Sequence, residues 1–154
     1  GILCAWVLAT AASDVTLLGH HAEKLALAQW RGIKTALSAD FTAPSGADIV
    51  VEATGSGQGI SAAIKLCRPR GAIVLKSTVA LPQNINLAPI VINELSVIGS
   101  RCGRFGDGLR MIQDFPDMPL QKMITARYPL AQVENAFTHA AQSDALKVLL
   151  HISS

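Results

Sequence analysis

Short apolar runs alternate with helical patterns along this chain. The clearest run, residues 48–53 (Asp-Ile-Val-Val-Glu-Ala), stops in Thr54-Gly55, and small residues with a second glycine-rich turn follow up to Gly59. A short β-branched run bounded by turn residues is typical of a strand covered on both faces of a parallel sheet. Ligands of open α/β sheets bind beyond the carboxyl ends of the strands, so we expect a flat ligand surface near residues 53–59. The alternative is a tight strand-to-helix turn without a ligand.

The remaining patterns predict helices and strands in alternation. Helical spacing of apolar residues predicts helices over 1–12, 23–30, 60–67, 106–115 and 130–141, and a brief one over 87–93, where Pro89 limits the length. Apolar runs predict strands over 15–18, 35–37, 72–75, 95–98 and 124–128, and period-two alternation predicts one over 146–152. Such alternation with short links predicts an α/β fold, a parallel sheet with helices on both faces. In the helix over 130–141, we expect the buried face to hold Val133, Phe137, Ala140 and Ala141.

Composition excludes several classes of function. The chain has 154 residues, of which 50% are hydrophobic, 16% charged and 5% aromatic, and its formal net charge is +2. This length can bury a core of its own. The chain has no run of Lys and Arg that would follow nucleic-acid phosphates or hold a membrane surface. Charged residues interrupt each apolar stretch before it reaches the length of a membrane span, so we expect neither a nucleic acid nor a membrane as partner.

Cysteine and histidine residues give no sign of a metal or catalytic centre. Cys4, Cys67 and Cys102 are widely spaced and form no CxxC pair, which argues against a disulfide framework or a structural zinc site. We expect all three to be small buried apolar residues, and a reducing cytoplasm is the simplest location. His139 and His151 have no acidic or cysteine partner at ligand spacing, so we expect them at the surface. These residues therefore predict no catalytic residue and no metal ligand.

Taken in order, several short segments resemble one family. They are residues 23–28 (Glu-Lys-Leu-Ala-Leu-Ala), 48–55, 68–71 (Arg-Pro-Arg-Gly), 97–100 (Val-Ile-Gly-Ser), 128–130 (Tyr-Pro-Leu), 134–137 (Glu-Asn-Ala-Phe) and 146–150 (Leu-Lys-Val-Leu-Leu). Together they make the chain similar to the coenzyme-binding half and C-terminal tail of medium-chain, zinc-type alcohol dehydrogenases. The resemblance implies a Rossmann domain for NAD or NADP over residues 1–118, and a tail over 119–154 that packs back on the catalytic domain. It also implies hydride transfer between an alcohol and an aldehyde or ketone.

The start of the chain leads us to expect a fragment. Gly1 resembles the third glycine of G-x-G-x-x-G, where the first helix packs closely and its N-terminus, with Ile2, holds the pyrophosphate. In this family the first strand and a zinc-carrying catalytic domain come before this point. The usual strand order places that strand between those predicted over 15–18 and 48–53, so the sheet would be truncated at its N-terminus. We expect the fragment alone to be inactive and the full protein to be a homodimer or larger.

The resemblance implies cofactor contacts where the strands end. Gly19 stands where NAD-binding members carry an acidic residue, which predicts a preference for NADP(H), with donors to its 2′-phosphate from His20, His21 and Lys24. The alternative is that the histidines are solvated turn residues, because neutral imidazole binds phosphate weakly. The other predicted contacts are Thr54, Gly55, Ser77, Thr78 and Val79 along the path from adenosine to nicotinamide, Arg101 after the last strand, and Lys147 at the pyrophosphate. Each of these also has a plain structural interpretation, as a turn residue or a solvated side chain.

Three other functions remain open from the sequence. A zinc-free quinone reductase differs from the zinc enzymes only in ligands that the N-terminal domain would carry. A non-catalytic nucleotide-binding or regulatory module would use the same sheet. A methyltransferase that binds S-adenosylmethionine would also place its cofactor loop after the first strand, but residues 53–55 and the tail over 128–150 favour the dehydrogenase.

Overall fold

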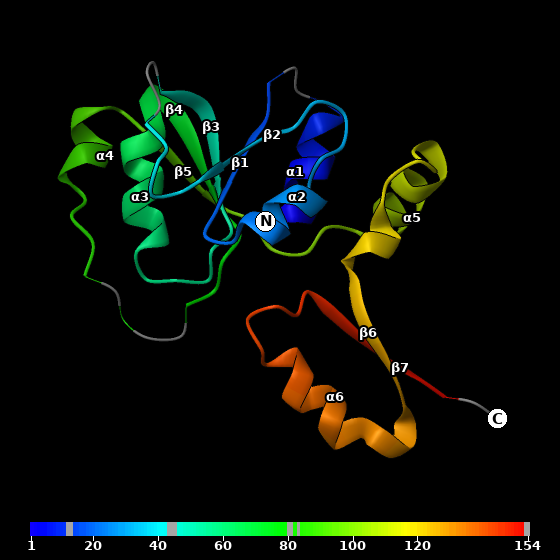
Figure 1. Ribbon diagram of the computed structural model, residues 1–154. Helices are drawn as coiled ribbons and strands as arrows, with labels where there is room; N and C mark the ends of the chain where they lie inside the picture. The colour runs from blue at the N-terminus through cyan, green and yellow to red at the C-terminus, as the bar shows by residue number, and fades with distance from the viewer. Residues whose placement is uncertain (12–13, 43–45, 80–81, 83, 153–154) are drawn as a thin grey trace.

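A computed structural model describes residues 1–11, 14–42, 46–79, 82 and 84–152. Helices and parallel strands alternate through these residues, as expected for an α/β protein of the Rossmann type (Figure 1). The strands are β1 (Thr16–Gly19), β2 (Lys34–Leu37), β3 (Ala47–Glu52), β4 (Cys67–Leu75), β5 (Ser96–Gly99), β6 (Ile124–Pro129) and β7 (Lys147–His151). The α-helices are α1 (Ile2–Ala9), α2 (Ala22–Leu27), α3 (Gly59–Leu66), α4 (Ala88–Ile92), α5 (Phe105–Asp114) and α6 (Val133–Ala140). The predicted helices and strands are thus confirmed in type and order, with shifts of their ends that are largest at the start of β4.

The strands of the described residues form three parallel sheets instead of one. β1 pairs with β2, β3 to β5 form a sheet in the order β3-β4-β5, and β6 pairs with β7. In Figure 1 the β6–β7 sheet and α6 form a separate lower part of the molecule. The strand pairs are parallel throughout, as the sequence predicts, but the first two sheets share no strand pairing within the described residues.

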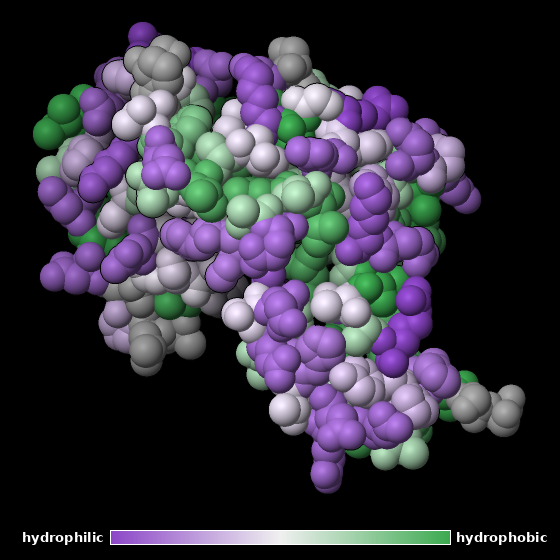
Figure 2. Space-filling model, viewed as in Figure 1, coloured by the Kyte–Doolittle hydropathy of each residue, from purple (hydrophilic) through white to green (hydrophobic). Residues whose placement is uncertain are grey.

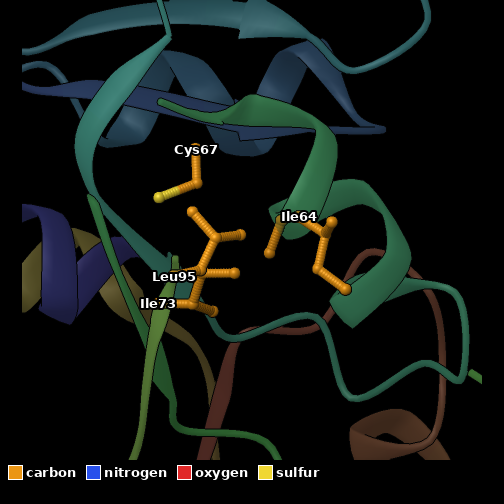
Figure 3. Close-up of a cluster of buried hydrophobic side chains, with 5 residues drawn as sticks. Ile64, Cys67, Ile73 and Leu95 are labelled. Atoms are coloured by element: carbon orange, nitrogen blue, oxygen red, sulfur yellow. The ribbon is translucent and has the colours of Figure 1, made fainter. Parts of the chain in front are cut away.

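The first hydrophobic core lies between α3 and the β3–β4–β5 sheet. Its buried members are Ala63, Ile64, Cys67, Ile73 and Leu95, with Ile60 and Ile90 packed against them (Figure 3). The predicted helical face of residues 60–67 is therefore confirmed, since the i, i+3, i+4 and i+7 positions all turn to the sheet. Burial raises the pKa of the Cys67 thiol, so this side chain acts as a small apolar residue.

The second core is built around Trp6. This indole is fully buried with Ala5 and Ile33, and its Nε1 donates to the carbonyl of Ala28 at 3.0 Å. Residues on both sides of the predicted boundary between 118 and 119 pack against the same cluster, namely Met118, Leu120 and Met123. The boundary predicted between residues 118 and 119 therefore runs through a packed cluster, and the division into two domains stays a prediction.

Two expectations about burial are wrong. The run over 48–53 was expected to be covered on both faces, but Ile49 is 57% exposed because β3 pairs with β4 alone within the described residues. In α6 the buried residue is Ala136, and Phe137 is 71% exposed, because the small side chain lets the helix approach the β6–β7 sheet. Figure 2 shows that apolar residues also reach the surface elsewhere, where they lie between polar residues across the viewed face.

The strand β4 begins earlier than predicted. It starts at Cys67 and includes the Arg68–Gly71 segment, which lies opposite Asp48 as an irregularity in the β3–β4 pairing. Arg70 has a positive φ of 61°, and Arg68 pairs with Asp48 across the irregularity. Extra residues in one strand of a pair bend the strand and keep the pairing on either side, which a pattern of apolar residues does not reveal.

Other surface predictions have mixed outcomes. Cys4 is half-buried and Cys102 is exposed, so the expectation of burial holds fully for Cys67 alone. His151 is exposed, whereas His139 is half-buried and its Nδ1 lies 3.0 Å from the Tyr128 hydroxyl. Within the described parts of the chain, no helix has the length and apolar character needed to cross a membrane.

Candidate functional site

The turns that follow β3, β4 and β5 meet at one edge of the sheet. Glu52 lies opposite Leu75 in the register, and Leu75 lies opposite Gly99, so the three strands end side by side. Figure 1 shows these carboxyl ends on the side of the molecule that also holds the N-terminus. Six predicted site residues belong to the segments that follow these ends, namely Thr54, Gly55, Ser77, Thr78, Val79 and Arg101.

Hydrogen bonds join these turns directly. The N–H of Gly55 donates to Ser77 Oγ at 2.8 Å, and the N–H of Lys76 donates to the carbonyl of Glu52 at 2.8 Å. On the other side, the N–H of Ser100 donates to the carbonyl of Leu75 at 2.9 Å. Gly55 has a φ of 70°, which only glycine adopts without strain, and no atom lies within 4 Å of where its Cβ would be. The turns are thus fixed to one another, and the space beside Gly55 is open.

An open groove of about 660 Å³ lies between the ends of β4 and β5. Its walls come from the two turns, residues 75–78 and 99–102. Lys76 crosses it, since Nζ donates to the carbonyl of Arg101 and lies 3.4 Å from Ser100 Oγ. A smaller hollow of about 130 Å³ lies beside Ser77, and Val79 and Glu52 are among its lining residues. The larger groove falls in the size range of ligand sites, which are about 300–1,000 Å³.

Glu52 is the buried charge of this region. Its side chain ends β3 and is 6% exposed. Oε1 accepts the N–H of Thr54 at 2.8 Å and the Thr54 hydroxyl at 2.6 Å. Desolvation raises the pKa of Glu52, but hydrogen bonds from Thr54 and Ser77 outweigh it and leave the pKa below its usual value. The carboxylate therefore stays ionised at neutral pH.

Sequence reasoning missed Glu52 as a site residue. A carboxylate at the end of an otherwise apolar strand was the available signal, because a buried carboxylate needs donors close by. Its partners in the turn after β4 lie 25 positions further on, and the strand register alone brings them together.

The predicted site residues Gly1, Gly19 and His20 lie around β1, which belongs to the β1–β2 sheet. Gly1 is the N-cap of α1, and Gly19 and His20 end β1 and follow it. A Cβ added to Gly1 would meet Leu17 Cδ1 at an ordinary 3.7 Å, and the close packing and cofactor contact expected at Gly1 stay predictions. At Gly19 an added Cβ would lie 3.0 Å from Leu25 Cδ2. Packing of α2 on β1 therefore explains the glycine at this position independently of any cofactor.

Lys24 and Lys147 are brought to the same region by a contact across the chain. Lys24 Nζ donates to the carbonyl of Ala145 at 3.2 Å, which places the turn before β7 against α2. Lys147, two residues further, is exposed at the start of β7. His20 is exposed, and His21 Nδ1 lies 3.6 Å from Glu23 Oε1. Lys24 and Lys147 thus lie near the turn before β7, and the carboxylates of Glu23 and Asp144 stand close to them in the sequence.

The described residues do not fit a zinc centre. No group of three or more His, Cys, Asp or Glu side chains lies close enough to hold a metal in residues 1–11, 14–42, 46–79, 82 and 84–152. Zinc needs at least three such ligands from the protein. No step of the chemistry is therefore assigned to a metal held by these residues.

Comparisons with known proteins identify one family. The sequence model of the family described as zinc-binding dehydrogenase matches residues 2–118. The sorbitol dehydrogenase of Halalkalibacterium halodurans is 27% identical over 118 residues, which are 74% of this chain and 34% of that protein. The chain thus spans about a third of the length of this curated relative.

Solved structures share the fold. Staphylococcus aureus TarJ, solved in complex with NADPH, matches 99% of this chain with a TM-score of 0.87 and 19% identity, and 52% of TarJ is covered. The alcohol dehydrogenase of Thermotoga maritima matches 99% of the chain with a TM-score of 0.83 and 21% identity, over 47% of its own length. A Sinorhizobium meliloti protein described as a zinc-binding dehydrogenase, solved bound to NADP, has a TM-score of 0.82 and 22% identity over 97% of this chain and 48% of its own. These likenesses show the fold.

Proposed function

The chain belongs to the zinc-binding dehydrogenase family, and we propose that it binds a nicotinamide dinucleotide for an alcohol dehydrogenase-like enzyme. The reaction would transfer hydride between an alcohol and an aldehyde or ketone. The dinucleotide supplies the hydride chemistry when bound, and this chain binds and orients it. Because the chain covers about half of the related structures, the activity of the whole protein is part of the proposal.

The observation that carries the proposal is the meeting of three turns beside an open groove. The Gly55 N–H bond to the Ser77 side chain and the Ser100 N–H bond to the Leu75 carbonyl tie the turns together, and small or polar side chains make up most of the groove's lining. Ligands of open parallel sheets bind at this edge, where backbone groups approach them closely. Two related structures hold NADPH or NADP, which supports the choice of a dinucleotide.

We assign the cofactor contacts as follows. The nicotinamide side would lie along Thr54, Gly55, Ser77, Thr78 and Val79, with Arg101 close to the groove. Gly1 and Ile2, at the start of α1, would approach the pyrophosphate, and Lys147 would offset its charge. The adenosine ribose would lie near Gly19, His20 and Lys24.

The proposed preference is for NADP(H). The end of β1 presents Gly19 and His20 in place of a carboxylate, and Lys24 adds a positive charge. Lys24 keeps further N–H donors beyond the one that reaches Ala145. Comparing the dissociation constants of NADPH and NADH on the full-length protein tests the preference, and equal affinities would overturn it. Lys24→Met should reduce the affinity for NADPH more than that for NADH, while Lys122→Met in the tail should change neither.

Zinc dependence separates the two candidate activities within the family, a zinc-dependent alcohol dehydrogenase and a zinc-free quinone reductase. A zinc enzyme would hold the metal in residues outside this sequence, and a quinone reductase would hold none. Metal analysis of the full-length protein distinguishes them, combined with assays against alcohols and quinones. A non-catalytic module would bind the dinucleotide and turn over neither substrate class.

We further propose that the full protein is a cytoplasmic homodimer or larger assembly. All four residues of β5 are exposed, and Val97 and Ile98 among them are apolar. An exposed edge strand with apolar side chains favours pairing with a second copy. Sedimentation of the full-length protein tests the assembly, and a monomer at micromolar concentration would contradict it.

A further inference from the structure

We propose that Glu52 is the positioning residue of the groove, whose carboxylate holds the turns after β3 and β4 in the arrangement that the nicotinamide half of the dinucleotide requires. The inference rests on the proposed function, because it assigns a role to a residue of the same site. Glu52 acts through Thr54 and Ser77.

The position of Glu52 fits this role. It is the last residue of β3, and its side chain reaches past the end of its own strand to the turn that follows. Thr54 donates to Oε1 with both its N–H and its hydroxyl. Ser77, in the turn after β4, lines the same small hollow as Glu52 and helps to lower the pKa of this carboxyl. The carboxylate therefore holds the two Thr54 donors of its own turn and lies beside Ser77 of the next turn.

A buried carboxylate is not needed to fill this space. Apolar side chains, Ile60, Leu75 and Ile85, line the hollow beside Glu52, and an apolar residue would continue the core. Removing a carboxylate from water costs free energy unless hydrogen bonds replace the lost hydration. What the charge adds is directional contact to Thr54, whose neighbour Gly55 is hydrogen-bonded to Ser77. Ser77 lines the groove that we assign to the cofactor.

The third element at this point is the start of α3. A Cβ added to Gly59 would lie 2.3 Å from both Glu52 Oε1 and Thr54 Oγ1, so only glycine lets the helix begin here. The carboxylate thus lies against the start of α3 and the turn after β3, beside the small hollow that Ser77 also lines. A displacement of Glu52 moves Thr54 or Ser77, and through the Gly55–Ser77 hydrogen bond it moves the neighbouring turn as well.

The chemistry of the carboxylate predicts which substitution removes the positioning role of Glu52. An ionised carboxylate accepts hydrogen bonds at both oxygens, whereas the amide of glutamine accepts at one and donates at the other. In Glu52→Gln, an NH₂ group of nearly unchanged volume replaces one carboxylate oxygen, so that Thr54 or the neighbouring Ser77 faces a donor in place of an acceptor. The substitution therefore loosens one turn and leaves the packing of the core in place.

The test compares two ligands on the purified protein by calorimetry, namely NADPH and 2′,5′-ADP, which lacks the nicotinamide half. We expect Glu52→Gln to weaken the affinity for NADPH about tenfold, which is the effect of losing one hydrogen bond to a charged group. The affinity for 2′,5′-ADP should change less than about twofold. Glu94→Gln is the matched control, because Glu94 is an exposed carboxylate paired with Arg70 before β5, and it should change neither affinity. Equal affinity of Glu52→Gln and wild type for NADPH, or an equal loss for both ligands, would overturn the proposal.

A second variant keeps the test decisive if Glu52→Gln does not fold. Thr54→Val removes one donor to the carboxylate at an exposed, isosteric position, and we expect the same selective loss of about threefold to tenfold for NADPH. An unchanged affinity of this variant for NADPH would also overturn the role of Glu52. Failure of the proposed function has a separate signature, since wild-type protein would then bind neither of these ligands and no NADH.

Discussion

The N–H of Gly55 donates to the hydroxyl oxygen of Ser77 at 2.8 Å, and this contact joins the turns that follow β3 and β4. The two residues are 22 positions apart in the sequence. Parallel pairing of β3 with β4 brings their carboxyl ends together, and the hydrogen bond then fixes the spacing of the turns. The edge of the sheet therefore has a defined shape before any ligand binds.

Ser77→Ala should weaken dinucleotide binding with little loss of stability. The variant removes the acceptor of the Gly55 N–H at a partly exposed position, so the free energy of unfolding should fall by at most about 1 kcal/mol. The affinity for NADPH should fall about threefold to tenfold, measured by fluorescence titration. Ser96→Ala on β5 serves as the control, and an equal effect of the two variants would contradict the assignment.

Gly59→Ala should destabilise the protein. The new methyl group would lie 2.3 Å from Glu52 Oε1, which has no room to move without losing its hydrogen bonds. Overpacking of this kind costs about 1–3 kcal/mol in chemical denaturation. Gly108→Ala in α5 is the control, because nothing lies within 4 Å of its Cβ position. It should stabilise the helix by about 0.5–1 kcal/mol, and a similar gain at position 59 would contradict the structure.

Trp6→Phe should cost more stability than Trp30→Phe. Trp6 is fully buried, and the variant removes the indole N–H that donates to the carbonyl of Ala28. The free energy of unfolding should fall by about 1–3 kcal/mol, because the carbonyl stays buried without a donor. The Nε1 of Trp30 donates to Asp117 at an exposed position, so its loss should cost under about 1 kcal/mol. Urea unfolding followed by far-UV circular dichroism measures both, and the reverse order would be inconsistent with the second core.

Acid should remove the stabilisation that Glu52 provides. Its pKa lies below the unfolded value of 4.5, so its contribution is fully present above that pH and disappears as the pH falls through the folded-state pKa. The difference in unfolding free energy between wild type and Glu52→Gln should therefore be constant from pH 7 to about 5.5 and shrink below about 4.5. A difference that grows on acidification would contradict the lowered pKa.

The sequence predicted those features that depend on local pattern. The face of α3 with Ala63, Ile64 and Cys67 follows from a 3.6-residue period, and the structure buries it. Strand order and helix order follow from the same periodicity and from short connections. Of the predicted site residues, Thr54, Gly55 and Ser77 meet because the ends of parallel strands share an edge.

Features that depend on non-local contacts were missed. The exposure of Ile49 follows from the pairing of β3 with β4 alone, which no local pattern of apolar residues encodes. The inward position of Ala136 in place of Phe137 depends on how closely α6 approaches its sheet. The role of Glu52 depends on donors in two turns that only the tertiary fold assembles.

The most direct measurement is a titration of ¹⁵N-labelled protein with NADPH, followed by backbone amide chemical shifts. We predict saturable shifts at Thr54, Gly55, Ser77, Thr78 and Arg101, which belong to the turns that meet at the ends of β3, β4 and β5. Saturable binding with no shift in these turns, or no binding at all, would contradict it.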